Sequence, residues 1–163
     1  MEEKFVIPSV GAIIEMHDNN EKYILMQKRK KYNEKIEYGL WEIPAGKIRE
    51  YENIYVALRR EVKEETNLDI TEIVDEDRTV CIDSLGYTIT NVCPYNIIQN
   101  MSGGYSIIVL TFLCKASGEI ICNPKENEGV QWRKIEEVRK ELTEFPEKFY
   151  PMHLLTLKKY LKI

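Results

Sequence analysis

The order of hydrophobic and polar residues along the chain predicts a succession of β-rich and helical segments. Near the start, the apolar runs 5–16 (FVIPSVGAIIEM) and 21–29 (EKYILMQKR) are separated by HDNN, a cluster of turn-forming residues. Together they predict a β-hairpin. Residues 40–47 (LWEIPAGK) begin with strand-like alternation that breaks at Pro44 and Gly46, which predicts a strand running into a loop.

The pattern changes to a helical period after Asn53. Apolar residues and glutamates recur at intervals of three and four, which predicts an amphipathic helix over about 54–66. Asn53 is suited to cap its start, and Asn67, which adopts the left-handed conformation readily, is suited to end it. The remaining predictions are a surface loop at 30–39, short strand-like pieces within 71–100, strands at 105–117 and 129–135, and helices at 135–142 and 151–161.

Length and composition favour a single globular domain over residues 1–163. The chain is 44% hydrophobic and 31% charged, and the mixture of strands and helices predicts an α/β sandwich around a central mixed β-sheet. No apolar run approaches the roughly 20 residues of a membrane span, and the acidic start lacks the basic residues of a signal peptide. A soluble, cytoplasmic protein without a membrane partner is therefore expected.

Charge and cysteine usage narrow the classes of partner. The formal charge of −4 and the pI near 5.4 argue against a nonspecific grip on nucleic acid or on an anionic membrane, so any anionic ligand is expected to be small. The cysteines show no C-x-x-C spacing and lie mostly in apolar runs, which predicts buried, reduced thiols rather than disulfides or zinc ligands. They are Cys81, Cys93, Cys114 and Cys122.

Three glutamates near the end of the predicted helix require an explanation. Glu61, Glu64 and Glu65 are neighbours on a helix surface, where like charges repel, and the helix dipole disfavours anions in the last turns. Glu61 and Glu65 also continue the apolar stripe, so they are expected to lose water. One interpretation is a solvated helix in which Arg60 pairs with Glu64. The other is a divalent-cation site, since Mg²⁺ prefers carboxylate oxygens together with substrate phosphates.

The loop before the helix favours the second interpretation. Residues 46–68 (GKIREYENIYVALRREVKEETNL) have the spacing G-x5-E-x7-R-E-U-x-E-E-x-N-U, where U is aliphatic. This spacing closely resembles the Nudix box, a loop-helix-loop that binds divalent metal, and only Asn67 departs, standing where the family has glycine. The segments SVGAII, ILMQKR, WEIPAGK and YSIIVLTFL resemble strands of the same family in the same order. The resemblance implies a Nudix-like α/β/α sandwich with a central mixed β-sheet.

The resemblance also implies a metal site. The matching family positions bind Mg²⁺ or Mn²⁺, and here they are Glu61, Glu64 and Glu65. A backbone carbonyl near the first glycine of the box often completes the metal shell in the family, which points to Ala45 or Gly46.

The implied reaction is metal-dependent hydrolysis of a pyrophosphate bond in a nucleoside diphosphate linked to another group. A cation that bridges phosphate oxygens and polarises the attacking water suits this chemistry. The general base in the family is a box glutamate, here Glu64, Glu65 or Glu61, or a glutamate on a later loop. Glu126 and Glu128 are the later candidates, and an ordinary polar turn explains that pair equally well.

Other positions are assigned to substrate contact or to support of the box. Arg29 resembles the phosphate-contacting arginine of the family, and Lys47 or Lys28 could assist it. Glu52 and Arg60 match the remaining charged positions of the box, and a structural role is expected for both. His17 and His153 are expected on the surface or in packing.

Two classes of function stay open from the sequence. The first is a pyrophosphohydrolase acting on a small nucleotide-like substrate. The second is a Nudix-fold module that binds a nucleotide or RNA without hydrolysing it, and the complete set of box glutamates favours the first. Members of the family often dimerise, so a homodimer is also an expectation.

Overall fold

The computed structural model describes residues 3–30, 36–125 and 127–163. The strands are β1 (Ile7–Asp18), β2 (Glu21–Arg29), β3 (Trp41–Glu42), β4 (Ala45–Lys47), β5 (Asp69–Ile73), β6 (Cys81–Ser84), β7 (Tyr87–Thr90), β8 (Asn96–Gln99), β9 (Ile107–Ser117) and β10 (Asn127–Lys134). The helices are α1 (Ile54–Thr66), α2 (Ile135–Glu144) and α3 (Pro151–Leu161), with short 3-10 turns η1 (Glu76–Arg78) and η2 (Pro146–Lys148).

A mixed sheet forms the centre of the fold. Its strands run in the order β10-β2-β1-β9-β5, while β3 pairs with β2, β4 with β1 and β8 with β9. The predicted hairpin is confirmed, because β1 and β2 are antiparallel and joined by the turn at Asn19 and Asn20. The parallel pairing of β1 with β9 makes the sheet mixed, as predicted.

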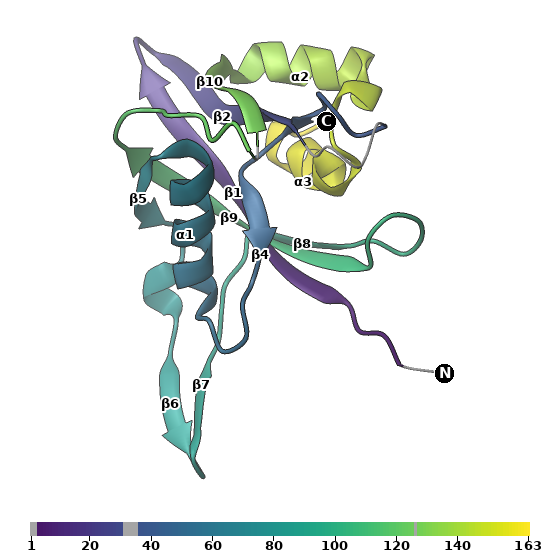
Figure 1. The fold of residues 1–163 in the computed structure, drawn as a ribbon. Coiled ribbons are helices and arrows are strands. Elements are labelled where there is room, and N and C mark those ends of the chain that lie inside the picture. The colour runs from purple at the N-terminus through teal and green to yellow at the C-terminus, as the bar shows by residue number, and fades with distance from the viewer. Residues whose placement is uncertain (1–2, 31–35, 126) are drawn as a thin grey trace.

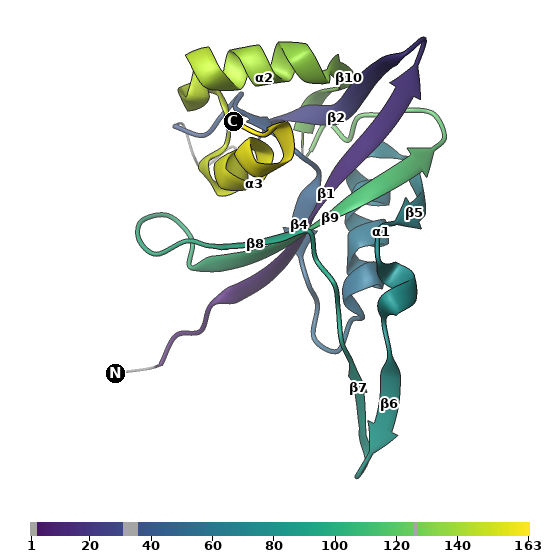
Figure 2. The same ribbon diagram turned by 180° about the vertical axis from the view of Figure 1, so that it is seen from behind.

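Helices cover both faces of the sheet, α1 on one face and α2 with α3 on the other (Figures 1 and 2). Strand β1 shows how the sequence supports this arrangement, since successive side chains of a strand point to opposite faces. Ala12 and Ile14 are buried with α1, whereas Ile13 is buried with α2 and α3. The apolar run of β1 is continuous because the strand contributes side chains to a core on each face of the sheet. The predicted α/β/α sandwich is confirmed.

Helix α1 begins and ends where the sequence predicts. The Asn53 side chain accepts hydrogen bonds from the backbone N–H groups of Tyr55 and Val56. Asn67 ends the helix in the left-handed conformation, with φ of 65°, and its side-chain amide donates to the carbonyl of Glu119 at 3.0 Å. Asn67 thus ends the helix at the position where the family has glycine, and its side chain also forms a hydrogen bond to the loop that contains Glu119.

Some local predictions are incomplete or wrong. The last strand begins at Asn127 rather than at residue 129, and part of the loop predicted at 30–39 lies outside the described residues. All four cysteines are free thiols, but only Cys114 is buried, and burial raises its pKa to about 12. Cys81 and Cys122 are exposed, because the segments that carry them lie outside both cores. Within the described chain, no helix has the length and apolar character needed to cross a membrane.

Candidate functional site

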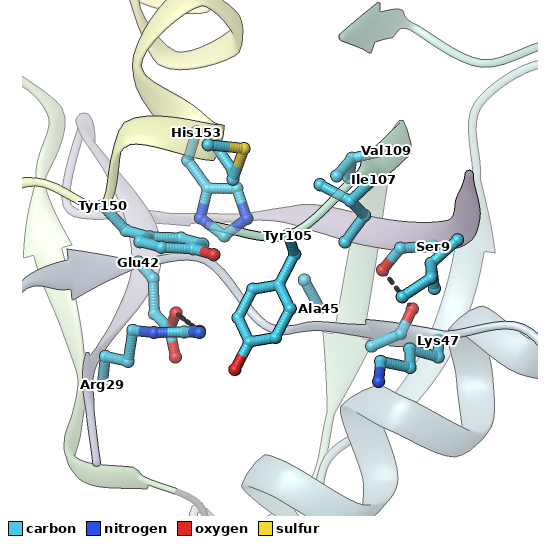
Figure 3. A pocket seen from close by; sticks show the side chains of 13 residues that line it. Ser9, Arg29, Glu42, Ala45, Lys47, Tyr105, Ile107, Val109, Tyr150 and His153 are labelled. Carbon is cyan, nitrogen blue, oxygen red and sulfur yellow. Dashed lines mark hydrogen bonds and ion pairs between the residues drawn. The ribbon is translucent and has the colours of Figure 1, made fainter. Parts of the chain in front are cut away.

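A pocket opens beside β4, between the sheet and the start of α3 (Figure 3). Its cavity volume is about 90 Å³, apart from the mouth, which is open to solvent. One part of its wall is charged or polar and the rest is apolar or aromatic. The lining residues are Ile7, Ser9, Arg29, Glu42, Ala45, Gly46, Lys47, Tyr105, Ile107, Val109, Tyr150, Met152 and His153.

Glu65, from the last turn of α1, lies buried behind this wall. Its Oε2 atom accepts hydrogen bonds from Gln27 Nε2 at 2.9 Å and from the backbone N–H of Ala45 at 3.1 Å. Burial raises the pKa of the Glu65 carboxyl well above its usual range, and the negative charge of Glu42 adds to the increase. Asn127 supports the same place by donating to the carbonyl of Glu65 at 2.9 Å and to Gln27 Oε1 at 3.2 Å.

Arg29 reaches the pocket from the end of β2, as its assignment to substrate contact requires. Its guanidinium donates to Glu42 at 3.1 Å and to Glu37 at 2.9 Å, and it stacks over the Tyr150 ring at 4.0 Å from the centroid. These contacts fix the orientation of a nearly buried cation at the pocket wall. Lys47 lies on the other side of the pocket and is exposed, with Tyr105 between the two cations in the view of Figure 3.

Arg60 gathers the charged residues of the box. It makes two hydrogen bonds to Glu52, at 2.7 and 2.8 Å, and one to Glu61 at 2.6 Å. Longer contacts join it to Glu64 Oε2 at 3.3 Å and to the carbonyl of Lys47 at 3.1 Å. The guanidinium lowers the pKa of Glu52 to about 2 through these hydrogen bonds. Glu52 and Arg60 thus connect the loop to the helix.

Gly46 brings the loop backbone against Glu61. A Cβ atom at this position would overlap the Glu61 carboxyl group, so only glycine allows the close approach. The hydroxyl of Ser9 donates to the carbonyl of Gly46 at 2.5 Å, which fixes the peptide on β1. The loop and the helix therefore place Ala45 and Gly46 beside Glu65 and Glu61, respectively.

His153 closes the pocket from α3 and is buried. Its Nδ1 atom accepts a hydrogen bond from the backbone N–H of Ile43 at 3.2 Å. Burial, together with the positive charge of Arg29, lowers the pKa of the imidazole to about 3. A neutral imidazole whose Nδ1 accepts must carry its proton on Nε2. His153 lines the pocket, and its Nε2–H group is therefore a hydrogen-bond donor whose orientation is fixed by the contact with Ile43.

The box glutamates suit a hard divalent cation, although two of them are held by arginines. Among the described residues, no three His, Cys, Asp or Glu side chains stand together closely enough to hold a metal. Glu61 contacts Arg60, and Glu64 contacts both Arg60 and Arg49. The donors are nevertheless those that Mg²⁺ prefers, and Glu65 is a buried carboxyl whose proton a cation could replace. The chemistry of these carboxylate donors therefore fits a divalent cation.

Two other predicted positions lie away from this group. Lys28 is placed with its ammonium over the Trp41 ring, 5.0 Å from the centroid, and does not line the pocket. Glu128 is paired in register with Lys28, and Asn127 is the neighbouring residue that reaches Glu65. Glu126 lies outside the described residues.

Sequence reasoning missed several residues that form the site. Gln27 and Glu42 are polar residues of β2 and β3 that are buried in the structure. Gln27 directly follows the apolar run ILM of β2, and that position was the available signal for it, since a polar side chain that continues a buried run needs a partner. Asn127 and the pocket-facing role of His153 had no comparable signal, because their partners lie 62 and 110 residues away in the sequence.

Comparison with known proteins agrees with this geometry. The chain matches the NUDIX domain family over residues 7–153, which is most of its length. The chain belongs to the NUDIX domain family. The predicted recognition, made from the box and its flanking strands, is therefore confirmed.

The similar curated proteins align with only part of the chain. An 8-oxo-dGTP diphosphatase from Buchnera aphidicola subsp. Schizaphis graminum is 41% identical over 61 residues, which are 37% of this chain and 42% of that protein. The 8-oxo-dGDP phosphatase NUDT18 from Danio rerio is 39% identical over 64 residues, which are 39% of this chain and 18% of that protein. The chain thus aligns with less than half the length of these NUDIX relatives.

Solved structures share the fold of this NUDIX domain at low sequence identity. The NUDIX domain of Shewanella oneidensis NrtR, crystallised with ADP ribose, is 16% identical, has a TM-score of 0.67, and aligns over 98% of this chain and 89% of that one. A MutT structure from the study of Aliivibrio salmonicida and Vibrio cholerae has a TM-score of 0.62 at 19% identity, over 97% and 98% of the two chains.

Proposed function

We propose that this NUDIX domain is a metal-dependent pyrophosphohydrolase that cleaves a P–O–P bond in a small nucleotide-like substrate. The observation that carries this proposal is the position of Glu65. Its carboxyl is buried against the backbone of Ala45, one residue before the glycine that packs on Glu61. A buried carboxyl with a raised pKa, placed among further carboxylates, is costly for folding and is typical of a functional site.

The metal would be held by the box. Glu61, Glu64 and Glu65 would supply carboxylate oxygens, with a backbone carbonyl of Ala45 or Gly46 beside them. A bound Mg²⁺ or Mn²⁺ would supply charge neutralisation at the phosphate oxygens and a more acidic water. To bind such an ion, Glu61 and Glu64 would have to give up their contacts with Arg60 and coordinate the cation instead.

The pocket would hold the rest of the substrate. Arg29 and Lys47 are cations on opposite sides of it and would bind the phosphates. Tyr105, Tyr150 and the apolar wall offer stacking and apolar surface to a base or sugar, and His153 offers its Nε2–H to an acceptor on that group. The proton released by the attacking water would pass to a glutamate of the box.

The second candidate function is binding of a nucleotide or RNA without hydrolysis. One observation favours it, namely that Arg60 already neutralises Glu61 and Glu64 in the structure. In this case the pocket would bind its ligand through Arg29 and the aromatic side chains, and the box would serve only to stabilise the fold.

We also propose a cytoplasmic location and pairing with a second copy, in line with the family resemblance.

The substrate class is best tested with a panel. The curated relatives named above act on oxidised guanine nucleotides, so 8-oxo-dGTP and 8-oxo-dGDP come first. ADP ribose, nucleotide sugars, unmodified nucleoside triphosphates and dinucleoside polyphosphates complete the panel. Release of phosphate or nucleoside monophosphate would be followed with Mg²⁺, with Mn²⁺ and with a chelator.

The decisive variant is Glu65→Gln, with Glu144→Gln as the matched control. Glu144 is an exposed residue at the end of α2, remote from the box. We expect Glu65→Gln to lower metal-dependent turnover more than about 100-fold, since it removes a charged ligand of the metal. The control should retain full activity. A Glu65→Gln variant as active as the parent would exclude the proposed metal site. Binding of Mn²⁺ and of a nucleotide without any turnover would favour the second candidate.

A further inference from the structure

The chain segment that leads into β10 closes the end of α1 (Figure 1). The last four carbonyl groups of an α-helix have no partner within the helix, and in α1 they belong to residues 63–66. The first of them accepts from the backbone N–H of Asn67. The other three accept from Asn123 Nδ2 (to Glu64, 3.3 Å), Asn127 Nδ2 (to Glu65, 2.9 Å) and the Ile121 N–H (to Thr66, 3.0 Å). We call Ile121, Asn123 and Asn127 the capping residues.

The capping residues lie where α1 has its least favourable charges. The helix dipole places partial negative charge at the end of a helix, and the carboxylates of Glu64 and Glu65 belong to the same turn. An N–H group that points at a carbonyl of this turn offsets part of that negative charge. The capping residues therefore stabilise the turn that carries two of the proposed metal ligands.

Asn127 reaches the carboxylate of Glu65 as well as its backbone. The nitrogen that donates to the Glu65 carbonyl also donates to Gln27 Oε1 at 3.2 Å. Gln27 in turn donates through Nε2 to Glu65 Oε2 at 2.9 Å. Both amide side chains are fully buried, since Asn127 and Gln27 are 0% exposed. The two amides together thus hold Glu65 at its backbone and at its carboxylate.

This double contact requires the chemistry of a primary amide at position 127. An uncharged amide nitrogen carries two hydrogens, so it can donate to the Glu65 carbonyl and to Gln27 Oε1 at the same time. Aspartate would place an oxygen against two oxygens, and the hydroxyl of serine has only one hydrogen to donate. Asn127 therefore contributes specific hydrogen bonds in addition to filling space in the core.

The carbonyl end of the Asn127 side chain points to a role beyond packing. Its Oδ1 atom is buried and accepts no hydrogen bond from any residue that the structure describes. Buried acceptors are nearly always paired, so an unpaired one in a folded protein requires an explanation. Water bound to a cation at Glu65 would be a donor of the kind that this oxygen needs. The unpaired oxygen thus favours a role in the metal site over a purely structural one.

We propose that Asn127 is a positioning residue of the metal site. It acts by holding Glu65 in one orientation, through the backbone carbonyl directly and through the carboxylate by way of Gln27. The inference rests on the proposed function, which assigns Glu65 as a metal ligand. Residues that hydrogen-bond to a metal ligand contribute roughly 10- to 100-fold to metal affinity, because they fix the orientation of the ligand in advance.

The test measures the affinity of the full chain for Mn²⁺ in the absence of nucleotide, from the EPR signal of the free ion. The variants are Asn127→Ala, Gln27→Met and the double variant; methionine keeps the length of the glutamine side chain and removes its amide. Asn123→Ala is the matched control, because the Asn123 amide donates to the same helix turn and, within the described chain, to no carboxylate. Thermal unfolding followed by circular dichroism with a chelator would establish that each variant is folded.

The parent should bind Mn²⁺, and Asn127→Ala and Gln27→Met should each weaken binding roughly 10- to 100-fold. Because both residues act on the same carboxylate, the double variant should lose little more than the worse single variant, rather than the product of the two losses. Asn123→Ala should lower the melting temperature, since a hydrogen bond at the helix end is lost, and should keep the Mn²⁺ affinity of the parent.

Three results would overturn the positioning role: an unchanged Mn²⁺ affinity in Asn127→Ala, single losses that multiply in the double variant, or an equal loss in Asn123→Ala. If Asn127→Ala does not fold, Gln27→Met decides, because it leaves the capping residues intact, and an unchanged affinity in that variant contradicts the proposal. A parent that binds no Mn²⁺ would reject the metal site of the proposed function, and this inference with it.

Discussion

Replacement of Gly46 by alanine tests whether the close packing of the box loop against Glu61 of α1 is needed for activity. A Cβ atom at Gly46 would lie 2.0 Å from Glu61 Cδ, whereas ordinary contacts begin near 3.4 Å. The Glu61 carboxyl must therefore move by at least about 1.4 Å, or the loop must shift away from it. Because the obstacle is the end of a flexible side chain, the fold should survive at a cost of about 1 kcal/mol, typical of one strained rotamer.

The effect on activity should be much larger than the effect on stability. A misplacement of about 1 Å at a catalytic group can lower the rate on the order of 100-fold, and Glu61 is one of the proposed metal ligands. We therefore expect Gly46→Ala to lose about 100-fold in Mg²⁺-dependent turnover while its melting temperature falls by only a few degrees. The measurements are hydrolysis of the best substrate of the panel and differential scanning calorimetry with a chelator.

Gly11→Ala is the matched control. Gly11 pairs with Ala45 on the neighbouring strand, and a Cβ there would meet its nearest atoms at 3.5 to 3.6 Å, which is ordinary contact. This variant should keep both stability and activity. If Gly46→Ala also kept full turnover, the position of Glu61 would be irrelevant to catalysis and the metal assignment would lose one ligand. Loss of folding in Gly46→Ala would show that the loop cannot adapt.

The remaining predictions concern titrating groups. The hydrogen bonds with Arg60 lower the pKa of Glu52 from 4.5 to about 2 on folding, so ionised Glu52 stabilises the folded state. Arg60→Met should remove this pH-dependent contribution to the free energy of unfolding. That contribution is fully present above pH 4.5 and is lost as the pH falls toward 2, so the melting temperatures of parent and variant should converge over this range. His153, with a pKa of about 3 instead of 6.5, should stabilise the fold fully above pH 6.5 and progressively less below it. Its imidazole NMR signals should stay those of the neutral Nε2–H form until the pH approaches 3, and titration near 6.5 would refute the buried placement.

The sequence predicted those features that depend on neighbouring residues. The hairpin of β1 and β2 follows from two apolar runs and a turn, and both ends of α1 follow from Asn53 and Asn67. The box carried enough fixed spacing to identify the family and with it the sandwich fold. Local patterns were sufficient here because caps, turns and periodicity are decided within a few residues.

Features that depend on distant residues were not predicted. The pocket wall joins Arg29 of β2 to Tyr150 before α3, and no local pattern reveals that contact. Likewise, Cys81 is exposed because the ribbon formed by β6 and β7 stands away from the rest of the fold (Figure 1), although the sequence of β6 resembles that of a buried strand. Periodicity indicates which side chains share a face of a strand, but packing decides whether anything covers that face.

Asn67 has a consequence for how this family can be recognised and how it can vary. The box position needs a backbone in the left-handed region, so a search pattern that demands glycine there describes one solution and overlooks another. In this chain the asparagine also binds the Glu119 carbonyl in the loop before β10. The two segments are therefore expected to change together in evolution, because glycine at 67 would end the helix but leave that carbonyl without its donor.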